Sequence, residues 1–202
     1  MKEIFLIRHA EAPYNSSILD PNRPLSTRGR QQAVDLAQLV RHFGIEEIHT
    51  SPYERCLNTI APLSEILRVK PYEVHDLRER EFTDYHVEDW GETWRTAWMD
   101  PDFSFRDGES GREAQARMYI AIESIITSST ARTLAISSHG NVIALLLQHI
   151  DTTYTFEHAC AIRNPDVFRV TYDGKTLHWD RTFEMDALED ISTAFGADPG
   201  TD

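Results

Sequence analysis

The chain has 202 residues, of which 41% are apolar and 26% charged, so it can bury one substantial core and has the composition of a globular protein. Its formal net charge of −13 argues against nucleic acid and against an anionic membrane surface as partners, because an acidic protein repels polyanions. The longest apolar run, VIALLL at 142–147, is too short to span a bilayer, and MKEIFLIRHA at the N-terminus does not read as a signal peptide.

These totals predict a cytoplasmic protein with one domain over residues 1–183 and an acidic tail over 184–202. The two cysteines, Cys56 and Cys160, have no motif spacing, so we expect buried thiols in a reducing compartment and leave a disulfide between them open. The sequence leaves the oligomeric state open as well, with a homodimer as one alternative.

Strand-like and helical segments alternate along the chain, which is typical of a parallel sheet flanked by helices. We expect strands at 3–7, 45–50, 72–77 and 133–138, and helices at 26–43, from about 52 to 67, from 110 onward and at 141–150. Ser51 and Ser110 each begin a pattern typical of a capping box, and 167–180 reads as a hairpin with an Asp-Gly turn. The predicted fold class is α/β: a three-layer α/β/α sandwich with a mostly parallel central sheet, an antiparallel edge hairpin and a small lid segment over about 80–108.

Polar side chains follow every predicted parallel strand at the point where the strand ends. Arg8 and His9 follow the first strand, Ser51 and Arg55 the second, Arg-Glu-Arg-Glu at 78–81 the third, and His139 with Gly140 the fourth. In open parallel sheets the carboxyl ends of the strands meet at one edge, where ligands bind. The order of the sequence therefore predicts two histidines, at least two arginines and a carboxylate at one site.

Each of these residues also has a structural interpretation when it is taken alone. A single histidine such as His9 is commonly a hydrogen-bonded core residue, and Ser51 is explained as a helix cap. Arg55 is harder to explain in this way, because a cation near the first turn of a helix opposes the helix dipole unless an anion binds there. His139-Gly140-Asn141 lies at a strand-to-helix turn, whose backbone N–H groups favour an anion.

Metal chemistry is a weaker interpretation, although the chain has nine histidines. No HExxH or other standard ligand spacing is present, so we expect no metal and no cofactor.

Six sequence blocks together resemble the histidine phosphatase superfamily, branch 1, the phosphoglycerate-mutase-like group. They run in the family's order from residue 6 to about 147: Arg8-His9-Ala10-Glu11-Ala12 with Asn15, Leu25-Ser26-x-x-Gly29-x-x-Gln32-Ala33, Ser51-Pro52-Tyr53-Glu54-Arg55-Cys56-x-x-Thr59, Leu77-Arg78-Glu79, Gly108-Glu109-Ser110 with Glu113, and Ser138-His139-Gly140. Two departures stand out, since Ala10 and Ala12 replace a glycine and a threonine of the first block. A third is FTDYHVEDWG, which replaces the short glycine-containing element that usually follows Glu79.

The resemblance implies that His9 is a nucleophile that carries a phosphoryl group. It also implies that Arg8, Arg55 and His139 neutralise the phosphoryl charge and that Asn15, Ser51, Gly140 and Asn141 bind the substrate. Glu79 would be the general acid, with Glu81 as the alternative left by the divergent segment. Such a site needs no metal, because preorganised positive charge supplies most of the rate.

The family's chemistry leaves three functions open for this chain. We favour a phosphatase that acts on small phosphomonoesters, with a small phosphorylated substrate or inorganic phosphate as its ligand. Phosphoglycerate-mutase-type transfer is the first alternative, and a non-catalytic phosphate- or phosphoprotein-binding relative is the second. The predicted lid carries Trp90, Trp94 and Trp98 at four-residue spacing, which is typical of packing, and it does not resemble the arginine-paired insertion of the glycolytic mutases.

Overall fold

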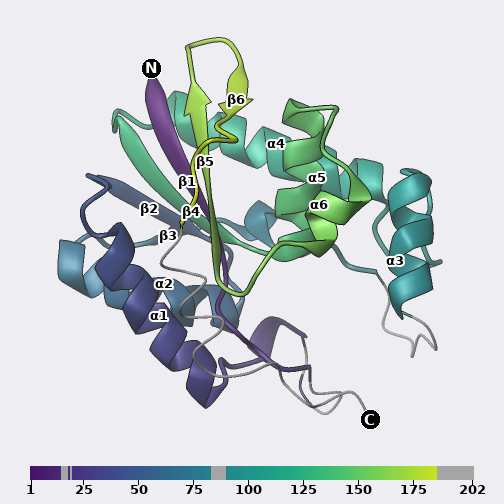
Figure 1. Cartoon of the computed structure of the whole chain (residues 1–202), viewed down its shortest axis with the longest axis horizontal. Helices are drawn as coiled ribbons and strands as arrows, with labels where there is room; N and C mark the ends of the chain where they lie inside the picture. Colours follow the sequence, from purple (N-terminus) through teal and green to yellow (C-terminus); the bar gives the residue numbers. More distant parts are fainter. Residues whose placement is uncertain (15–17, 19, 83–89, 186–202) are drawn as a thin grey trace.

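The fold is built on one mixed sheet, and the computed structural model describes residues 1–14, 18, 20–82 and 90–185 of the chain (Figure 1). The strand order is β3-β2-β4-β1-β5-β6. The first four of these strands are parallel to one another, whereas β5 is antiparallel to β1 and β6 is antiparallel to β5. The predicted α/β class, the mostly parallel sheet and the antiparallel edge hairpin are therefore confirmed.

The strands are β1 (Lys2–Arg8), β2 (Glu47–Thr50), β3 (Tyr72–Glu73), β4 (Thr133–Ser138), β5 (Asp166–Tyr172) and β6 (Leu177–Trp179). The α-helices are α1 (Thr27–Val40), α2 (Glu54–Leu67), α3 (Trp90–Met99), α4 (Gly111–Ser128), α5 (Gly140–Ile150) and α6 (Phe156–Cys160), and two short 3-10 helices are η1 (Asp20–Asn22) and η2 (His75–Leu77).

Helices cover both faces of the sheet, which gives the three predicted layers (Figure 1). Side chains alternate across a strand, so Ile4 and Leu6 of β1 pack with residues of α4 and α5, whereas Phe5 and Ile7 pack with residues of α1 and α2. All four of these side chains are buried, because β1 lies between β4 and β5 inside the sheet. The buried centre of the sheet fixes where β1 and β4 end, and therefore the positions of Arg8, the last residue of β1, and of His9 and His139, which follow the two strands.

The expected strand at 72–77 is wrong beyond its first two residues. Only Tyr72 and Glu73 pair with β2, and the chain then turns into η2, in which the Leu77 N–H donates to the Val74 carbonyl at 3.1 Å. β3 is an edge strand with both residues exposed, so little burial holds it longer. The turn places Leu77 in the core and aims the following residues across the strand ends.

The two predicted capping boxes have different outcomes. The Ser110 box is confirmed: its hydroxyl accepts from the Glu113 N–H, and the Glu113 carboxylate accepts from the Ser110 N–H. The Ser51 box is wrong, because α2 begins at Glu54 with Tyr53 as an N-cap that makes no side-chain bond. The expected helix at 26–43 is shorter, since α1 is capped by Ser26 and ends at Val40.

The two cysteines are both free thiols, but they differ in burial. Cys56 is buried as expected, whereas Cys160 is exposed, so the prediction of two buried thiols is wrong. The short helix α6 was not predicted from the sequence, and most of the predicted acidic tail lies outside the described residues.

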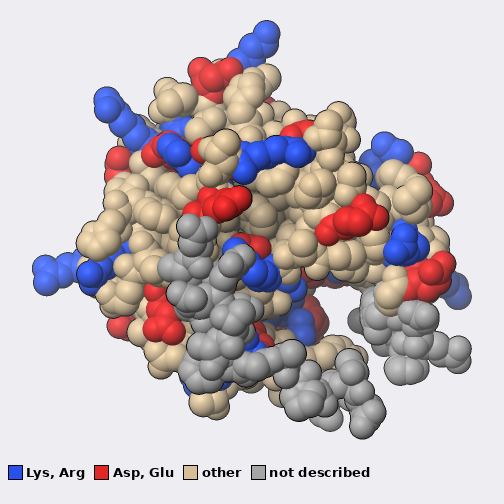
Figure 2. Space-filling model, in the orientation of Figure 1, with Lys and Arg blue, Asp and Glu red and all other residues tan. Residues whose placement is uncertain are grey.

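None of the described helices is long and apolar enough to cross a membrane. Figure 2 shows basic and acidic side chains interspersed over the described part of one face.

Candidate functional site

The ends of β1 and β4 bring His9 and His139 together, as their order in the sequence predicted. The two strands run parallel with Arg8 opposite Ser138, and the His9 N–H donates to the Ser138 carbonyl at 3.1 Å. The imidazole rings lie 5.3 Å apart between centroids and meet edge to face. Residues 130 positions apart in the chain therefore share one site.

The backbone fixes which nitrogen of His9 carries the proton. Nδ1 lies 2.7 Å from the carbonyl oxygen of Ala10, which can only accept, so Nδ1 is the protonated nitrogen. Nε2 consequently carries the lone pair. A neutral imidazole held in this tautomer is the form that can attack phosphorus.

Arg55 directs its guanidinium at that lone pair. Its Nε–H donates to His9 Nε2 at 3.1 Å, and the side chain is 1% exposed. The guanidinium also stacks on the Tyr53 ring, 4.9 Å from its centroid. A cation in the first turn of α2 is unfavourable, because it opposes the helix dipole. The position is explained by the site, since it brings the guanidinium of Arg55 to the His9 imidazole.

His139 is completely buried beside Ser51 and Cys56. Its Nε2 is hydrogen-bonded to the Ser51 hydroxyl at 2.8 Å, and the Cys56 sulfur lies 3.5 Å from the same nitrogen. Burial raises the pKa of the Cys56 thiol to about 12, so the thiol stays protonated and donates to the Ser138 carbonyl. Ser51 thus orients His139, and its interpretation as the cap of α2 is wrong, because Tyr53 is the N-cap of that helix.

Both histidines are neutral in the folded protein. Burial lowers the pKa of His9 well below its usual value, and the Arg55 cation lowers it further. The pKa of His139 is lowered in the same way, first by burial and then by Arg55 and His9. A neutral histidine pair beside the guanidinium groups of Arg8 and Arg55 is suited to an anionic ligand, because the neutral imidazoles leave the site with a positive charge that an anion can compensate.

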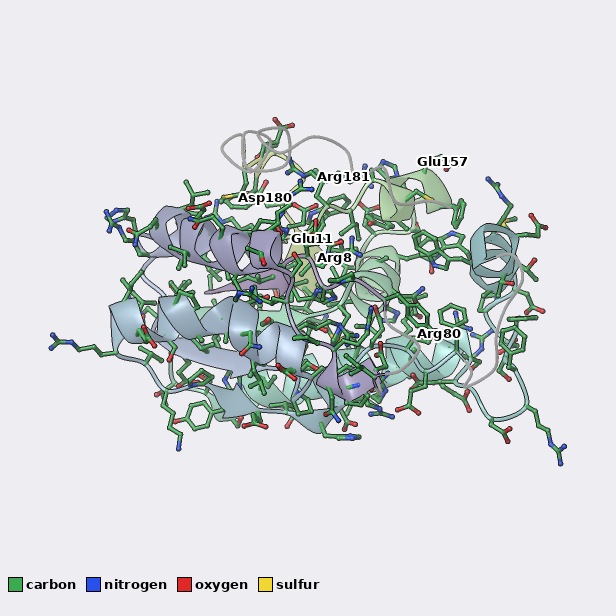
Figure 3. All side chains as sticks on the ribbon, turned by 90° about the horizontal axis from the view of Figure 1, so that it is seen from below. Arg8, Glu11, Arg80, Glu157, Asp180 and Arg181 are labelled. Carbon is green, nitrogen blue, oxygen red and sulfur yellow. The ribbon has the colours of Figure 1, made fainter. Side chains whose placement is uncertain are left out.

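Arg8 lies close to the first residue of α5, near the middle of the molecule in Figure 3. Its Nη1 donates to the Ile162 carbonyl at 2.7 Å, whereas its Nε is buried and has no hydrogen-bond partner among the described residues. A Cβ added at Gly140 would lie 2.9 Å from the Arg8 guanidinium carbon, so glycine allows this approach. The unused donor of Arg8 is a feature that an oxyanion would satisfy.

Glu79 is held by the N-terminus of α5. Its carboxylate accepts from the N–H groups of Asn141 at 3.2 Å, Val142 at 3.1 Å and Arg80 at 2.9 Å. The Asn141 N–H, which we expected to bind substrate, is therefore already used by the proposed acid. Gly140 is the first residue of α5, so its N–H has no acceptor within the helix.

Arg117 of α4 supports the segment that carries Glu79. Its guanidinium pairs with both oxygens of Glu109 at 2.7 and 2.6 Å, and it donates to the carbonyls of Asp76 at 2.7 Å and Arg78 at 3.1 Å. Glu81, the alternative acid, is exposed and pairs with Arg78 at 3.3 Å. The geometry therefore distinguishes the two carboxylates, since Glu79 alone faces the strand ends.

A cavity of about 240 Å³ opens beside these residues, and Arg8, Glu79, Gly140 and Asn141 contribute polar groups to its lining. Phe82 and Trp94 are among its apolar lining residues. Predicted site residue Asn15 lies outside the described residues. No group of three or more potential metal ligands comes together in the described part of the chain.

Sequence reasoning missed Asp20 and Arg23. The Asp20 carboxylate lies 3.0 Å from Arg55 Nη2 and 2.7 Å from Arg23 Nε, and the Asp20 carbonyl accepts from Arg55 Nη1 at 2.7 Å. Arg23 also contributes to the lowered pKa of both histidines. Both residues lie between two family blocks in a stretch without motif spacing, so no signal in the sequence identified them.

Comparison with known proteins identifies the family of the chain. The family model of the histidine phosphatase superfamily, branch 1, matches residues 4–184. Two proteins named probable phosphoglycerate mutase GpmB, from Proteus mirabilis and Klebsiella pneumoniae, are each 26% identical over 186 residues, which cover 85% of this chain and 86% of theirs.

Solved structures share the fold. A mycobacterial glucosyl-3-phosphoglycerate phosphatase, solved with VO3, superposes with a TM-score of 0.75 at 21% identity, over 89% of this chain and 98% of that one. YhfR of Bacillus stearothermophilus has a TM-score of 0.75 at 24% identity, over 89% and 95% of the two chains. With its strand ends, buried histidine pair and family match in agreement, this chain belongs to the histidine phosphatase superfamily, branch 1.

Proposed function

We propose that the protein is a phosphatase that hydrolyses small phosphomonoesters through a phosphohistidine on His9. The observation that carries the proposal is the hydrogen-bonding of this ring: Nδ1–H donates to the Ala10 carbonyl, and the lone pair of Nε2 faces the Arg55 guanidinium. The imidazole is thereby oriented as a nucleophile with a cation beside the atom that attacks.

In the first step His9 Nε2 forms a bond to phosphorus while the ester oxygen leaves. Arg8, Arg55 and the neutral His139 stabilise the phosphoryl oxygens, and the Gly140 N–H adds a donor. Glu79 in its protonated form gives a proton to the leaving oxygen. Its carboxylate then removes a proton from water, which attacks the phosphohistidine and releases phosphate and free His9.

Water is the proposed acceptor because no arginine of the predicted lid (Arg80, Arg95 or Arg106) lines the cavity beside Glu79. The Arg80 guanidinium donates to the carbonyls of Glu109 and Phe103, both at 2.9 Å, and Arg95 stacks on Phe156 at 4.8 Å. Neither residue lines the cavity beside Glu79. A mutase must retain its substrate between two transfers, which requires an additional anchor for the substrate carboxylate.

Mutase-type transfer remains the second candidate, because the GpmB relatives are named probable phosphoglycerate mutases. Product analysis with 3-phosphoglycerate distinguishes the two reactions. A phosphatase releases inorganic phosphate and glycerate, whereas a mutase forms 2-phosphoglycerate.

The intermediate is tested by rapid quenching without acid after mixing with a radiolabelled phosphomonoester. We expect label on His9 that is stable in alkali and lost in acid, and no turnover by His9→Ala, which should still bind phosphate. Saturable phosphate binding by the wild-type protein without phosphate release from any ester would instead identify a binding protein.

A further inference from the structure

The cavity beside Glu79 is lined by both polar and apolar residues, and these residues indicate which leaving group of the substrate it accepts. The inference drawn from it rests on the proposed phosphatase activity. A general acid must reach the leaving oxygen, and both Glu79 and Arg8 line this cavity. With the phosphoryl group at Arg8 and His9, the leaving group extends into the cavity.

The cavity offers a single cation. Arg8 is the only lysine or arginine among its lining residues, and Glu79 adds a carboxylate. The stretches 15–17, 19, 83–89 and 186–202, which the structure does not describe, contain no lysine or arginine in their sequence. The described residues therefore include every lysine and arginine of the chain. Among the arginines of the neighbouring elements that do not line the cavity, Arg80 donates to two carbonyls, Arg95 stacks on Phe156 and Arg163 pairs with Asp166.

A negative charge on the leaving group would therefore be poorly compensated. The substrate phosphate takes the cationic partner Arg8, and a carboxylate or second phosphate farther along would be desolvated near Glu79 without a counter-cation. The same cavity imposes no such cost on a neutral leaving group.

The other lining residues supply fixed apolar surface. The Phe82 ring lies beneath the Arg80 guanidinium, 4.2 Å from its centroid, and Trp94 packs edge to face on Phe156 at 5.2 Å. Ile162, whose carbonyl accepts from Arg8, adds further apolar lining. The volume of about 240 Å³ lies below the roughly 300–1,000 Å³ that drug-sized ligands occupy, so the cavity suits a single ring better than an extended group.

We propose that this phosphatase selects monophosphate esters whose leaving group is neutral and has an apolar or aromatic face, and that it discriminates against leaving groups that carry a carboxylate or a second phosphate. Phe82 and Trp94 are the specificity-determining residues of this subsite, and the missing second cation is the basis of the discrimination.

The test uses two esters of nearly equal size and leaving-group chemistry, benzyl phosphate and 4-carboxybenzyl phosphate. We expect kcat/KM for the carboxylated ester to be at least about tenfold lower, mainly through KM. Equal kcat/KM for the two esters would overturn the selectivity and leave the phosphatase intact. Release of phosphate from neither ester, nor from any other monophosphate, would overturn the proposed function itself.

Two variants at one position then locate the effect. Trp94→Lys adds a cation to the cavity lining and should reduce the ratio of kcat/KM for benzyl phosphate to that for 4-carboxybenzyl phosphate several-fold. Trp94→Gln removes the ring without adding charge, so it should raise KM for benzyl phosphate while the neutral ester remains preferred. Thermal unfolding shows whether each variant folds. An unchanged preference in folded Trp94→Lys would place the leaving group elsewhere and contradict the proposal, and the wild-type pair tests it even if neither variant folds.

Discussion

Arg55 and His9, 46 positions apart, are joined by a buried hydrogen bond in which the guanidinium Nε–H donates to the imidazole Nε2 at 3.1 Å. The same guanidinium donates through Nη1 and Nη2 to Asp20. Three separate donors in a fixed plane are used, which is a geometry that lysine cannot reproduce. A lysine at position 55 therefore cannot make all three of these contacts.

We predict that Arg55→Lys lowers kcat/KM for a phosphomonoester by about a hundredfold to a thousandfold, the loss typical of removing one oxyanion donor. Arg112→Lys is the matched control, because Arg112 is exposed and pairs only with Asp102 near the surface. Steady-state kinetics of both variants give the result. Activity of Arg55→Lys within threefold of wild type would show that charge alone suffices at this position.

The two buried histidines should make stability depend on pH. Their pKa values in the folded state are lowered, whereas in the unfolded chain they titrate near about 6.5. Below that pH the unfolded state binds more protons than the folded state, so the free energy of unfolding falls as pH decreases. The contribution is fully present above about pH 6.5, and each histidine adds a slope of up to about 1.4 kcal/mol per pH unit below it.

Urea denaturation between pH 7.5 and pH 5 measures this slope. His139→Gln removes one titrating group whose pKa is lowered in the folded state and should flatten the curve. A wild-type stability that stays constant over this interval would mean that both histidines accept protons in the folded state.

The sequence predicted the strand ends well because burial controls them. Ile4 and Leu6 are fully buried between neighbouring strands, so the hydrophobic pattern itself shows that β1 ends close to Arg8, which is its last residue. The same applies to β4 and His139. Capping of α4 was predictable too, since the Ser110 and Glu113 bonds are local to one turn.

Features that depend on the tertiary neighbourhood were not predictable. Ser51 has the spacing of a cap, yet its hydroxyl contacts His139, which is 88 residues away. The strand expected to reach Leu77 stops at Glu73, because pairing at an exposed edge gains less than burying Leu77 through a turn. Asp20 shows the same limit, since its role depends on where Arg55 lies.

The Asp20 carboxylate lies between the guanidinium groups of Arg55 and Arg23, at 3.0 and 2.7 Å. Asp20 is therefore an anion between these two arginine side chains, and it competes with a phosphoryl group for their N–H donors. We predict that Asp20→Asn lowers the inhibition constants of phosphate and orthovanadate by about threefold to tenfold. In the variant, a larger fraction of the molecules has the Arg55 and Arg23 guanidinium groups available to bind the anion.

Asp102→Asn is the control for this prediction, since it removes a carboxylate from an exposed ion pair with Arg112 at 2.6 Å. Inhibition by this variant should match the wild type. Weaker phosphate binding by Asp20→Asn would reverse the interpretation and show that the carboxylate orients Arg55 for its ligand.

Glu79 and Glu81 are close in sequence but have different surroundings, and this difference predicts which one is the acid. Glu79 lines the cavity and accepts three backbone N–H bonds, whereas Glu81 is exposed beside Arg78. We expect Glu79→Gln to lower hydrolysis of an alkyl phosphate by about a hundredfold to ten-thousandfold. The loss should be much smaller with 4-nitrophenyl phosphate, whose leaving group needs little protonation.

Glu81→Gln should behave like the wild type with both substrates, apart from a small change in stability from the exposed pair with Arg78. The dependence on the leaving group separates a lost proton donor from a distorted site, since distortion would slow both esters alike. If Glu81→Gln shows the selective loss instead, the acid is Glu81, and the bonds from α5 to Glu79 serve only to hold the chain.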